Sequence, residues 1–590
     1  MRKEPVITAD LPATRQEMSA LGWSRADVIL VSGDAFIDSP YIGVAVIARV
    51  LLDAGYRVAL IAQPDIHNDR DITRLGEPAL FWGVTGGCMD SMVANYTATG
   101  KPRRSDDLTP GGRNTRRPDR TVIVYSNLIR RHFKQTVPIV LGGIEASLRR
   151  ISHYDAWSGR VRRSILFDAK ADLLLYGMAE TSIVEVARAI EDKHDVRGIR
   201  GVCYISPALP GPVDVFSGPD IALPAHAEVV KEKEMFAEMF RTFYANIHPQ
   251  TARRLYQQQD TRYLVHNPPS FPLSVEELDA VYERPYTRQG HPREKDQGSI
   301  RALETIRFGL TTHRGCYGEC RFCAIAVHQG TQVVSRSMNS LLREAASFRS
   351  HPDFKGIISD VGGPTANMYA IECSRKQRKG PCRDKGCLFP EPCPKLPIRH
   401  RAQMDLLSRL RALPGIRKVF IGSGLRHDMI AGDRRDGMAY LEQILKYHIS
   451  GQLKIAPEHV QENVLNLMGK PGRDILEGFH GMFYKLNQRQ TQKTFLTYYL
   501  LADHPGCTLA DMKALREYAL RRLRMLPEQV QIFTPTPSTF STLMYHTQRD
   551  PFSGKTLFVE KNVGGKQKQK DALKRTKQKH RFTKDKRSKR

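Results

Sequence analysis

Short apolar runs alternate with amphipathic and glycine-rich segments at the start of the chain. Residues 27–32 and 56–61 are two such runs, each long enough for a buried strand. Between them Val44, Ile47 and Leu51 recur at a spacing that places them on one face of a helix. Further strands are predicted at 121–125, 138–141 and 172–176. Strands separated in this way indicate an open, parallel α/β sheet, which binds ligands at the carboxyl ends of its strands.

Three further regions follow this sheet domain, which we assign to residues 1–205. Residues 206–299 carry charged helical stretches and a Pro-rich segment, and they are predicted to form a connector. Residues 300–556 again alternate between strands and helices, and residues 557–590 form the C-terminal tail. The strands predicted in the third region are 307–311, 356–359, 418–421, 452–455, 495–500 and 529–533. Six such repeats indicate a partial (β/α)6 barrel, in which chemistry lies at the C-terminal ends of the strands.

Positive charge is concentrated in the C-terminal tail. The whole sequence carries a net charge of +28, and residues 561–590 contribute 14 Lys/Arg against two Asp. We predict that the tail is disordered, because so few apolar side chains cannot offset the entropy of ordering it. Such a tail binds RNA or the ribosome through phosphate contacts, or it only adds solubility.

The composition limits the class of protein. No apolar run approaches the length of a membrane span, and the N-terminal residues lack the apolar segment of a signal peptide. Ten cysteines in 590 residues are too few for a disulfide scaffold. We therefore expect a cytoplasmic protein that does not bind membranes and whose reduced thiols are free to bind metal. The sequence leaves the oligomeric state open.

Three of the cysteines form the motif with the most chemical content. Cys316, Cys320 and Cys323 have the spacing C-x3-C-x2-C and follow the first predicted barrel strand. Three thiolates on one loop can hold three irons of a [4Fe–4S] cluster and leave the fourth iron open for a ligand. The alternative is a zinc site, which usually pairs two cysteines with a second, distant pair.

This motif, with Phe322 before its last cysteine, resembles the signature of the radical S-adenosylmethionine (SAM) superfamily. The resemblance implies that the open iron chelates the amino and carboxylate groups of SAM. It also implies that an electron from the cluster cleaves SAM to methionine and a 5′-deoxyadenosyl radical. An electron donor of the flavodoxin or ferredoxin type is therefore an expected partner.

Residues after the other predicted barrel strands agree with that resemblance. Gly362 and Gly363, before Pro364, resemble the Gly-Gly-Glu-Pro of the superfamily, whose backbone binds the SAM amino group, although the Glu is missing here. Glu458 follows the fourth strand, at a place where the superfamily often contacts the SAM ribose or carboxylate. The resemblance thus implies that Gly362, Gly363 and Glu458 contact SAM, and it assigns no catalytic residue.

Longer segments resemble the YgiQ family of radical SAM proteins, over roughly residues 15–555. These segments are 90–92, 125–127, 142–150, 153–155 and 363–369. The first domain also resembles the cobalamin-binding-type Rossmann domain that precedes the barrel in many radical SAM enzymes. The cobalamin motif Asp-x-His-x-x-Gly is absent, because residues 34–39 contain no histidine. This absence argues against cobalamin, and the resemblance implies no substrate.

A second cysteine group lies in a Lys/Arg/Pro-rich insertion of the barrel, residues 370–397. Its members are Cys373, Cys382, Cys387 and Cys393. The insertion has little apolar content, so a bound metal would supply its folding energy. An auxiliary Fe–S cluster, a structural zinc, and four reduced thiols that bind nothing all stay open.

Together these features predict a radical SAM enzyme that acts on an unidentified substrate. Positive charge outside the tail, including the basic run 375–383, slightly favours a polyanion such as RNA, and hence RNA modification. The contrasting hypothesis is a non-enzymatic RNA- or ribosome-associated protein that keeps the cluster as a redox sensor. Cleavage of SAM under reducing conditions distinguishes the two.

Overall fold

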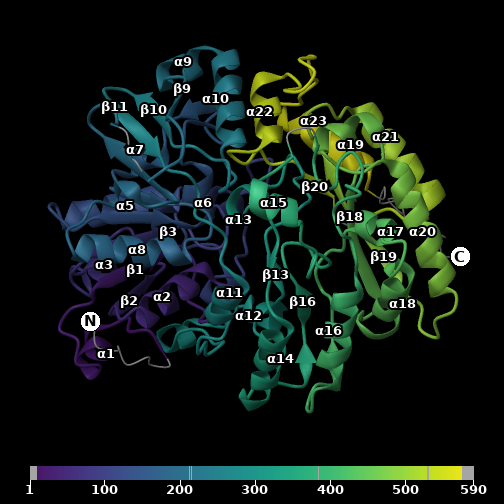
Figure 1. Ribbon diagram of the computed structural model, residues 1–590, viewed down its shortest axis with the longest axis horizontal. Coiled ribbons are helices and arrows are strands. Elements are labelled where there is room, and N and C mark those ends of the chain that lie inside the picture. The colour runs from purple at the N-terminus through teal and green to yellow at the C-terminus, as the bar shows by residue number, and fades with distance from the viewer. Residues whose placement is uncertain (1–9, 212, 214, 383–384, 528–529, 575–590) are drawn as a thin grey trace, which may run out of the picture.

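The computed structural model describes residues 10–211, 213, 215–382, 385–527 and 530–574. It consists of two α/β halves that lie side by side (Figure 1). The N-terminal half, coloured purple to blue, contains one large sheet, and the C-terminal half, coloured teal to yellow, contains the strands of the barrel. The two halves confirm the predicted fold class.

Nine strands form the sheet of the N-terminal half, in the order β2-β1-β3-β4-β7-β8-β11-β10-β9. Their bounds are β1 (Val28–Ser32), β2 (Val58–Ala62), β3 (Phe81–Thr85), β4 (Ile139–Gly142), β7 (Leu173–Leu175), β8 (Val202–Ser206), β9 (Ile221–Leu223), β10 (Leu255–Gln259) and β11 (Arg262–His266). The first five strands in spatial order are parallel, and antiparallel pairing begins between β7 and β8. The strands predicted at 27–32, 56–61, 138–141 and 172–176 are therefore confirmed.

The structure corrects one predicted strand and adds another. Residues 121–125 are not a strand but the start of helix α5 (Thr121–His132), whose Val122, Tyr125 and Ile129 are buried at helical spacing. Strand β3, which the sequence analysis does not predict, lies in the sheet between β1 and β4.

The sheet also continues past residue 205. Strands β9, β10 and β11 come from the segment 206–299, which the sequence predicts to be a connector. The sequence pattern does not predict β10, because its buried residues Gln257 and Gln259 are polar. Their side-chain amides can be buried because they form hydrogen bonds inside the protein. Gln257 Oε1 accepts from Ser152 N at 3.2 Å, and Gln259 Oε1 accepts from Ser164 N at 2.9 Å. Only the later part of the segment leads to the barrel.

Helices pack on the sheet in pairs. Helix α2 (Gly43–Asp53) contacts α8 (Glu180–Glu191), and α5 contacts α7 (Ile165–Ala169). With helices packed on the sheet, β1 is buried at every position. This burial explains why the parallel strands appear in the sequence as continuous apolar runs.

The strands of the C-terminal half are parallel neighbours in chain order. The pairs are β12 (Gly309–Thr311) with β16 (Asp360–Gly362), β15 (Ile357–Ile358) with β17 (Lys418–Val419), β18 (Gln452–Glu458) with β19 (Phe495–Ala502), and β19 with β20 (Gln531–Ile532). An isolated parallel β-bridge between Leu425 and Ile455 links the segment after β17 to β18. This order confirms the predicted partial barrel.

The other elements connect and cover these strands. The helices between barrel strands are α14 (Met338–Ser347), α16 (Arg401–Ala412), α18 (Gly437–Tyr447), α20 (Arg473–Asn487) and α21 (Leu509–Tyr518). The remaining elements are α1 (Arg15–Ala20), α3 (Arg70–Thr73), α4 (Ser91–Asn95), α6 (Gly143–Leu148), α9 (His226–Lys231), α10 (Lys233–Ala245), α11 (Val275–Tyr282), α12 (Leu303–Ile306), α13 (Ala324–Gln329), α15 (Ser374–Lys379), α17 (His427–Gly432), α19 (Glu462–Met468), α22 (Phe540–Thr547), α23 (Val563–Ala572), β5 (His153–Asp155), β6 (Arg160–Arg162), β13 (His313–Arg314) and β14 (Val334–Ser335). Within the described part of the chain, no helix is long and apolar enough to cross a membrane.

The prediction of a disordered tail over 557–590 is wrong for its first part, because α23 is folded against the barrel. Lys566 Nζ lies 3.0 Å from Asp503 Oδ2, and Gln569 accepts from Asp503 N and donates to Cys507 O, both at 3.0 Å. Leu573 is fully buried. The segment is polar, but its polar side chains find partners inside the protein. Residues 575–590 lie outside the described residues.

Candidate active site

The three motif cysteines lie on one loop between strand β13 and helix α13. Strand β13 pairs antiparallel with β14 and fixes the start of the loop. Gly315 has φ +77, and a Cβ there would lie 1.8 Å from the carbonyl oxygen of Gln332, so only glycine fits. Cys323 is the N-cap residue of α13, and its backbone N–H donates to Cys320 O at 2.9 Å.

Two of the thiols converge above Gly318. A Cβ added to this glycine would lie 3.2 Å from Cys316 Sγ and 3.6 Å from Cys320 Sγ, and Gly318 N donates to Cys316 Sγ at 3.3 Å. Burial, together with the charges of Cys320 and Cys316, raises the pKa of Cys323 to about 12. The three thiols are therefore close enough to influence one another.

Among the residues that the structure describes, no group of three or more His, Cys, Asp or Glu side chains is arranged to hold one metal ion. In a [4Fe–4S] cluster each cysteine binds a different iron, so its thiolates stand farther apart than the donors of one zinc. Three thiols on one loop are compatible with such a cluster.

A buried ion pair faces this loop. Arg426 Nη1 lies 3.5 Å from Cys320 Sγ, while its Nε and Nη2 donate to Asp428 Oδ1 and Oδ2 at 2.8 and 2.5 Å. Although burial favours the protonated acid, Arg426 and its hydrogen bonds lower the pKa of Asp428 to about 2. The pair thus holds a permanent positive charge beside the thiols, and a nearby cation favours the thiolate that binds metal.

The predicted glycines lie at the end of the second barrel strand. A Cβ added to Gly363 would lie 2.7 Å from His313 Cε1, Nε2 and O, so the backbone of Gly363 approaches His313 as only glycine allows. Asp360, three residues earlier, accepts from Gly422 N at 2.8 Å and Ser423 N at 3.2 Å. This carboxylate ties the second and third strand ends together.

Glu458 ends β18 with a φ of +68, which is uncommon for a residue with a side chain. Its carboxylate lies 3.9 Å from Lys470 Nζ. Burial raises the pKa of Glu458, while Lys470 and Arg426 act to lower it. The structure thus brings Glu458 near the cluster loop, on the side of Arg426.

A cavity of about 480 Å³ opens between the two halves of the molecule. We call it the interdomain cavity. The sheet contributes residues at the carboxyl ends of β1, β3, β4 and β7, and the barrel contributes Thr311, His313, Gly362, Gly363 and Ser423. Helix α13 adds Ile325 and His328 directly after the cluster loop. Glu458 is not among the described residues that line it. The predicted ligand-binding ends of the sheet and of the barrel therefore face one space.

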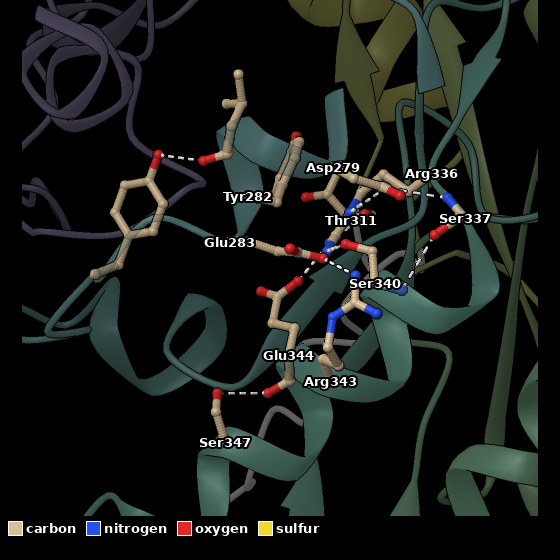
Figure 2. Close-up of polar contacts among 12 residues, drawn as sticks. Asp279, Tyr282, Glu283, Thr311, Arg336, Ser337, Ser340, Arg343, Glu344 and Ser347 are labelled. Carbon is tan, nitrogen blue, oxygen red and sulfur yellow. Dashed lines mark hydrogen bonds and ion pairs between the residues drawn. The ribbon is translucent and has the colours of Figure 1, made fainter. Parts of the chain in front are cut away.

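One wall of this cavity is fixed by a buried polar network. The ring of Tyr282, on α11, lies between Arg336 Cζ at 4.4 Å and Arg314 Cζ at 5.1 Å. Arg336 also donates to Thr311 O at 3.3 Å and lies 3.7 Å from Asp279 of α11 (Figure 2). Because Tyr282 and Thr311 both line the cavity, this network fixes the connecting helix to the first barrel strand at the cavity.

The second cysteine group lies against the cluster loop. Cys373, Cys387 and Cys393 pack with Tyr317 in a small apolar core that Cys316 also contacts. Cys373 N donates to Tyr317 Oη at 3.0 Å. Within the described residues Cys382 is not part of this core, so the structure brings three of the four predicted thiols together.

A lysine of helix α15 links the insertion to the cluster loop. Lys376 Nζ lies 2.6 Å from Glu319 Oε1 and 3.7 Å from Cys387 Sγ. The Lys376 side chain is only 3% exposed. The insertion is therefore joined to the loop by a buried ion pair as well as by apolar contact.

Sequence reasoning missed four side chains of this site: His313, Asp360, Arg426 and Asp428. His313 and Asp360 lie within the short strands β13 and β16, whereas Arg426 and Asp428 lie at the start of helix α17. Their roles depend on which strand ends become neighbours in space, and no local pattern gives that information.

Solved structures similar to this chain include TsrM from Kitasatospora setae and OxsB. The structure of TsrM, a radical SAM methyltransferase, with cobalamin and a [4Fe–4S] cluster is 16% identical, with a TM-score of 0.48, over 87% of this chain and 76% of TsrM. The structure of OxsB, a cobalamin-dependent SAM radical enzyme, with aqua-cobalamin and SAM is 12% identical, with a TM-score of 0.47, over 90% of this chain and 57% of OxsB.

These structures correct the expectation that argues against cobalamin. TsrM and OxsB hold cobalamin. The expectation against cobalamin, which rests on the missing Asp-x-His-x-x-Gly motif at residues 34–39, is therefore corrected.

Sequence relatives identify the family. The model of the family described as "Radical SAM N-terminal" matches residues 10–309. A UPF0313 protein of Fusobacterium nucleatum is 52% identical over 95% of this chain and 98% of its own length. UPF0313 proteins of Methanocella arvoryzae and Thermotoga maritima are 47% and 45% identical, over 93% and 95% of this chain and 90% and 98% of their own lengths. The chain therefore belongs to the UPF0313 family of the radical SAM superfamily.

Proposed function

We propose that this chain is an enzyme that holds a [4Fe–4S] cluster on Cys316, Cys320 and Cys323 and reductively cleaves SAM to begin radical chemistry. The observation that carries the proposal is the convergence of Cys316 and Cys320 on Gly318, beside Arg426. When bound, the cluster supplies an open iron for SAM and the electron for its cleavage. A flavodoxin- or ferredoxin-type donor would provide that electron.

The chain's own residues position and shield the reactants. Gly363 lets the backbone come close to a ligand at the mouth of the barrel, and His313 behind it stays neutral because burial lowers its pKa to about 3. Arg426, fixed by Asp428, keeps positive charge beside Cys320. Glu458, held near Lys470, offers a carboxylate to a polar part of SAM.

The interdomain cavity leaves room for a substrate or a second ligand beside the barrel mouth. On its sheet side Gly83 packs closely against Leu30, since a Cβ on Gly83 would lie 2.6 Å from Leu30 Cδ2. Its volume is within the usual range for small-molecule sites. We therefore include cobalamin among the ligands to test, by titration of the purified chain with hydroxocobalamin and measurement of its absorbance.

A polyanionic substrate such as RNA is favoured by basic side chains near the cluster loop. Arg375, Arg378 and Lys379 are exposed on α15, the helix whose Lys376 contacts the loop. Exposed guanidinium and ammonium groups bind phosphate and make the affinity salt-dependent. Crosslinking of the reduced, SAM-loaded protein to cellular RNA, repeated at increasing salt, tests this substrate class.

The proposal is tested by anaerobic reconstitution with iron and sulfide. The wild type should bind about four irons at the motif and form 5′-deoxyadenosine from SAM under reducing conditions. Cys320→Ala should lose this product, while circular dichroism should show an unchanged fold. The same amount of 5′-deoxyadenosine from the variant would contradict the assignment, whereas iron binding without any SAM cleavage in the wild type would favour the redox-sensing binding protein.

A further inference from the structure

The insertion 370–397 has little regular structure. Between the end of helix α15 at Lys379 and the start of α16 at Arg401, no described residue belongs to a helix or a strand. Connections of this length without secondary structure are uncommon and are usually functional. Leu388 and Leu396 of the insertion are nevertheless buried, with 1% and 5% of their surface exposed. The segment therefore keeps one arrangement without the backbone hydrogen bonds of a helix or a sheet.

Three thiols of the insertion gather around one aromatic ring. Cys373, Cys387 and Cys393 contact the small core around Tyr317, which Cys316 of the cluster loop also contacts. Cys373 N donates to Tyr317 Oη at 3.0 Å, and Cys393 N donates to Cys387 O at 2.8 Å. The three residues have free thiols and are partly exposed. A free cysteine that only packs is usually fully buried, so packing alone does not explain three partly exposed cysteines in one place.

A buried cation lies beside these thiols. Lys376 Nζ is 3.7 Å from Cys387 Sγ and 5.5 Å from the centre of the Tyr317 ring, and its side chain is only 3% exposed. A cation beside a thiol favours the thiolate, which is the form that binds metal. The same positive charge offsets the negative charge of a thiolate-bound metal group, and local charge helps to set the reduction potential of an Fe–S cluster.

Three carboxylates belong to the same region. Glu319 Oε1 lies 2.6 Å from Lys376 Nζ and neutralises part of its charge. Glu372 Oε2 accepts from Gln377 Nε2 at 2.9 Å, and Glu391 is exposed. Two of these carboxylates thus already have partners inside the protein, and the thiols are the soft donors of the region. Soft thiolate donors select Fe–S clusters, zinc or copper(I) over hard cations.

The arrangement of the donors argues against a single bound ion. A structural zinc needs four donors around one point. Among the residues that the structure describes, no three Cys, His, Asp or Glu side chains are arranged to hold one metal ion. Each thiolate of an Fe–S cluster binds a different iron, so its ligands need not converge on one point. Three thiols that share one core but no single-ion position therefore favour a cluster.

We propose that Cys373, Cys387 and Cys393 hold a second [4Fe–4S] cluster. It lies next to the cluster loop, because its ligands contact the same core as Cys316. None of its ligands belongs to the C-x3-C-x2-C motif, so this site goes beyond SAM cleavage and does not depend on it. Binding of the cluster supplies the folding energy that the irregular insertion lacks. Lys376 stabilises the cluster when it takes up an electron from a donor of the flavodoxin or ferredoxin type.

Anaerobic reconstitution of the wild type and of two variants with iron and sulfide tests the proposal. The motif variant combines Cys316→Ala, Cys320→Ala and Cys323→Ala, and the insertion variant combines Cys373→Ser, Cys387→Ser and Cys393→Ser. The wild type should bind about eight irons and about eight sulfides, four of each for every cluster. Each variant should keep about four of each, because each loses one cluster. These counts do not depend on SAM cleavage, which is measured separately as 5′-deoxyadenosine.

The reduction potential of the second cluster tests the role of Lys376. A redox titration of the motif variant measures this potential without the first cluster. Lys376→Met removes the buried cation and should make reduction about tenfold less favourable, which for one electron lowers the potential by about 59 mV. Lys379→Met, at an exposed position of the same helix, is the matched control and should leave the potential unchanged. An unchanged potential in Lys376→Met would mean that the cluster does not lie beside Cys387.

Three further outcomes overturn the proposal. About four irons in the wild type and none in the motif variant would show that the insertion binds no cluster. Zinc in the motif variant, without iron or sulfide, would identify a zinc site. Cys88→Ser changes an exposed cysteine of the sheet half, and an equal loss of iron there would show that iron binds to thiols without specificity. Because the motif variant keeps the insertion intact, its iron content decides the question even if the insertion variant does not fold.

Discussion

Arg426 places a fixed positive charge beside the thiols of the cluster loop. Three thiolates in a partly buried loop repel one another, and a neighbouring guanidinium reduces that repulsion. The pair Arg426–Asp428 is itself buried, so neither charge can be removed without leaving the other uncompensated. Asp428 therefore positions Arg426 toward Cys320 and does not need to contact a substrate.

Gly363→Ala is expected to weaken SAM binding without unfolding the protein. The added Cβ would lie 2.7 Å from the His313 ring and carbonyl oxygen, so the strand end must move. Such overpacking costs about 1–3 kcal/mol, and displacement of the backbone that we propose to bind SAM should weaken SAM binding about tenfold. Equilibrium dialysis of SAM against the reconstituted wild type and variant measures this change in affinity.

The control for that variant is Gly478→Ala on α20. A Cβ at this position meets no atom within 4 Å, and alanine is the better helix former. SAM affinity should equal that of the wild type. Unchanged SAM affinity in Gly363→Ala as well would refute the role assigned to this backbone segment.

Glu294 should make the stability of the chain depend on pH. Burial raises the pKa of its carboxyl to about 7, above the ordinary 4.5. The folded protein keeps this proton where the unfolded chain loses it, so stability is lost as the pH rises from about 4.5 to about 7. Glu294→Gln should match the wild type near pH 4 and exceed its free energy of unfolding by about 3 kcal/mol near pH 8. Urea denaturation at both values measures the difference, and a gap that does not change with pH would contradict this pKa.

At the scale of elements, the sequence predicts those strands whose burial gives them an apolar composition. Strand β1 appears as a continuous apolar run because every position of it is buried. Helix α5 was missed because the β-branched run at 121–125 favours a strand, and only its packing selects the helix. Helix α23 was missed because it is anchored by Lys566 and Gln569 rather than by an apolar face. The spacing of Cys316, Cys320 and Cys323 alone predicts them as cluster ligands, whereas Arg426 comes near them only through the fold of the barrel.

The insertion helix α15 should depend on Lys376 for its attachment to the cluster loop. Lys376→Met removes the ion pair with Glu319 and the contact with Cys387 but keeps a side chain of similar length. Losing a buried polar link costs about 1–3 kcal/mol locally, so chymotrypsin should cleave within 370–397 about tenfold faster. Lys379→Met, at an exposed position of the same helix, should be cleaved like the wild type. Equal cleavage of both variants would show that apolar contacts alone hold the insertion.

Helix α23 should stabilise the barrel through Lys566. Lys566→Met leaves the buried carboxylate of Asp503 without its partner, at a cost of about 3 kcal/mol. The thermal midpoint should fall, and it should recover in part at low pH, because a protonated Asp503 needs no cation. Lys568→Met changes an exposed lysine two residues away on the same helix and should leave the midpoint unchanged. A fall that does not depend on pH would mean that the loss arises from packing.

At the scale of the whole molecule, the two halves share one site. Neither half encloses the interdomain cavity alone, since the sheet supplies one side and the barrel mouth the other. Tyr282, between Arg314 and Arg336, fixes the link between them at the cavity wall. A ligand bound at the barrel mouth therefore lies beside residues of both halves.

This arrangement predicts that SAM protects both halves from hydrogen exchange at once. In the reconstituted protein, SAM should slow exchange at residues 362–364 of the barrel and also at 142–144 and 177–180 of the sheet, because all three segments line the same cavity. Strands β9 and β10 lie at the far edge of the sheet and should exchange at the same rate with and without SAM. Ligand binding slows exchange only where it suppresses local opening, so the pattern reports which walls close on the ligand. Protection confined to the barrel segments would show that the sheet is not part of the SAM-bound site, and the cavity would then have to serve a different ligand.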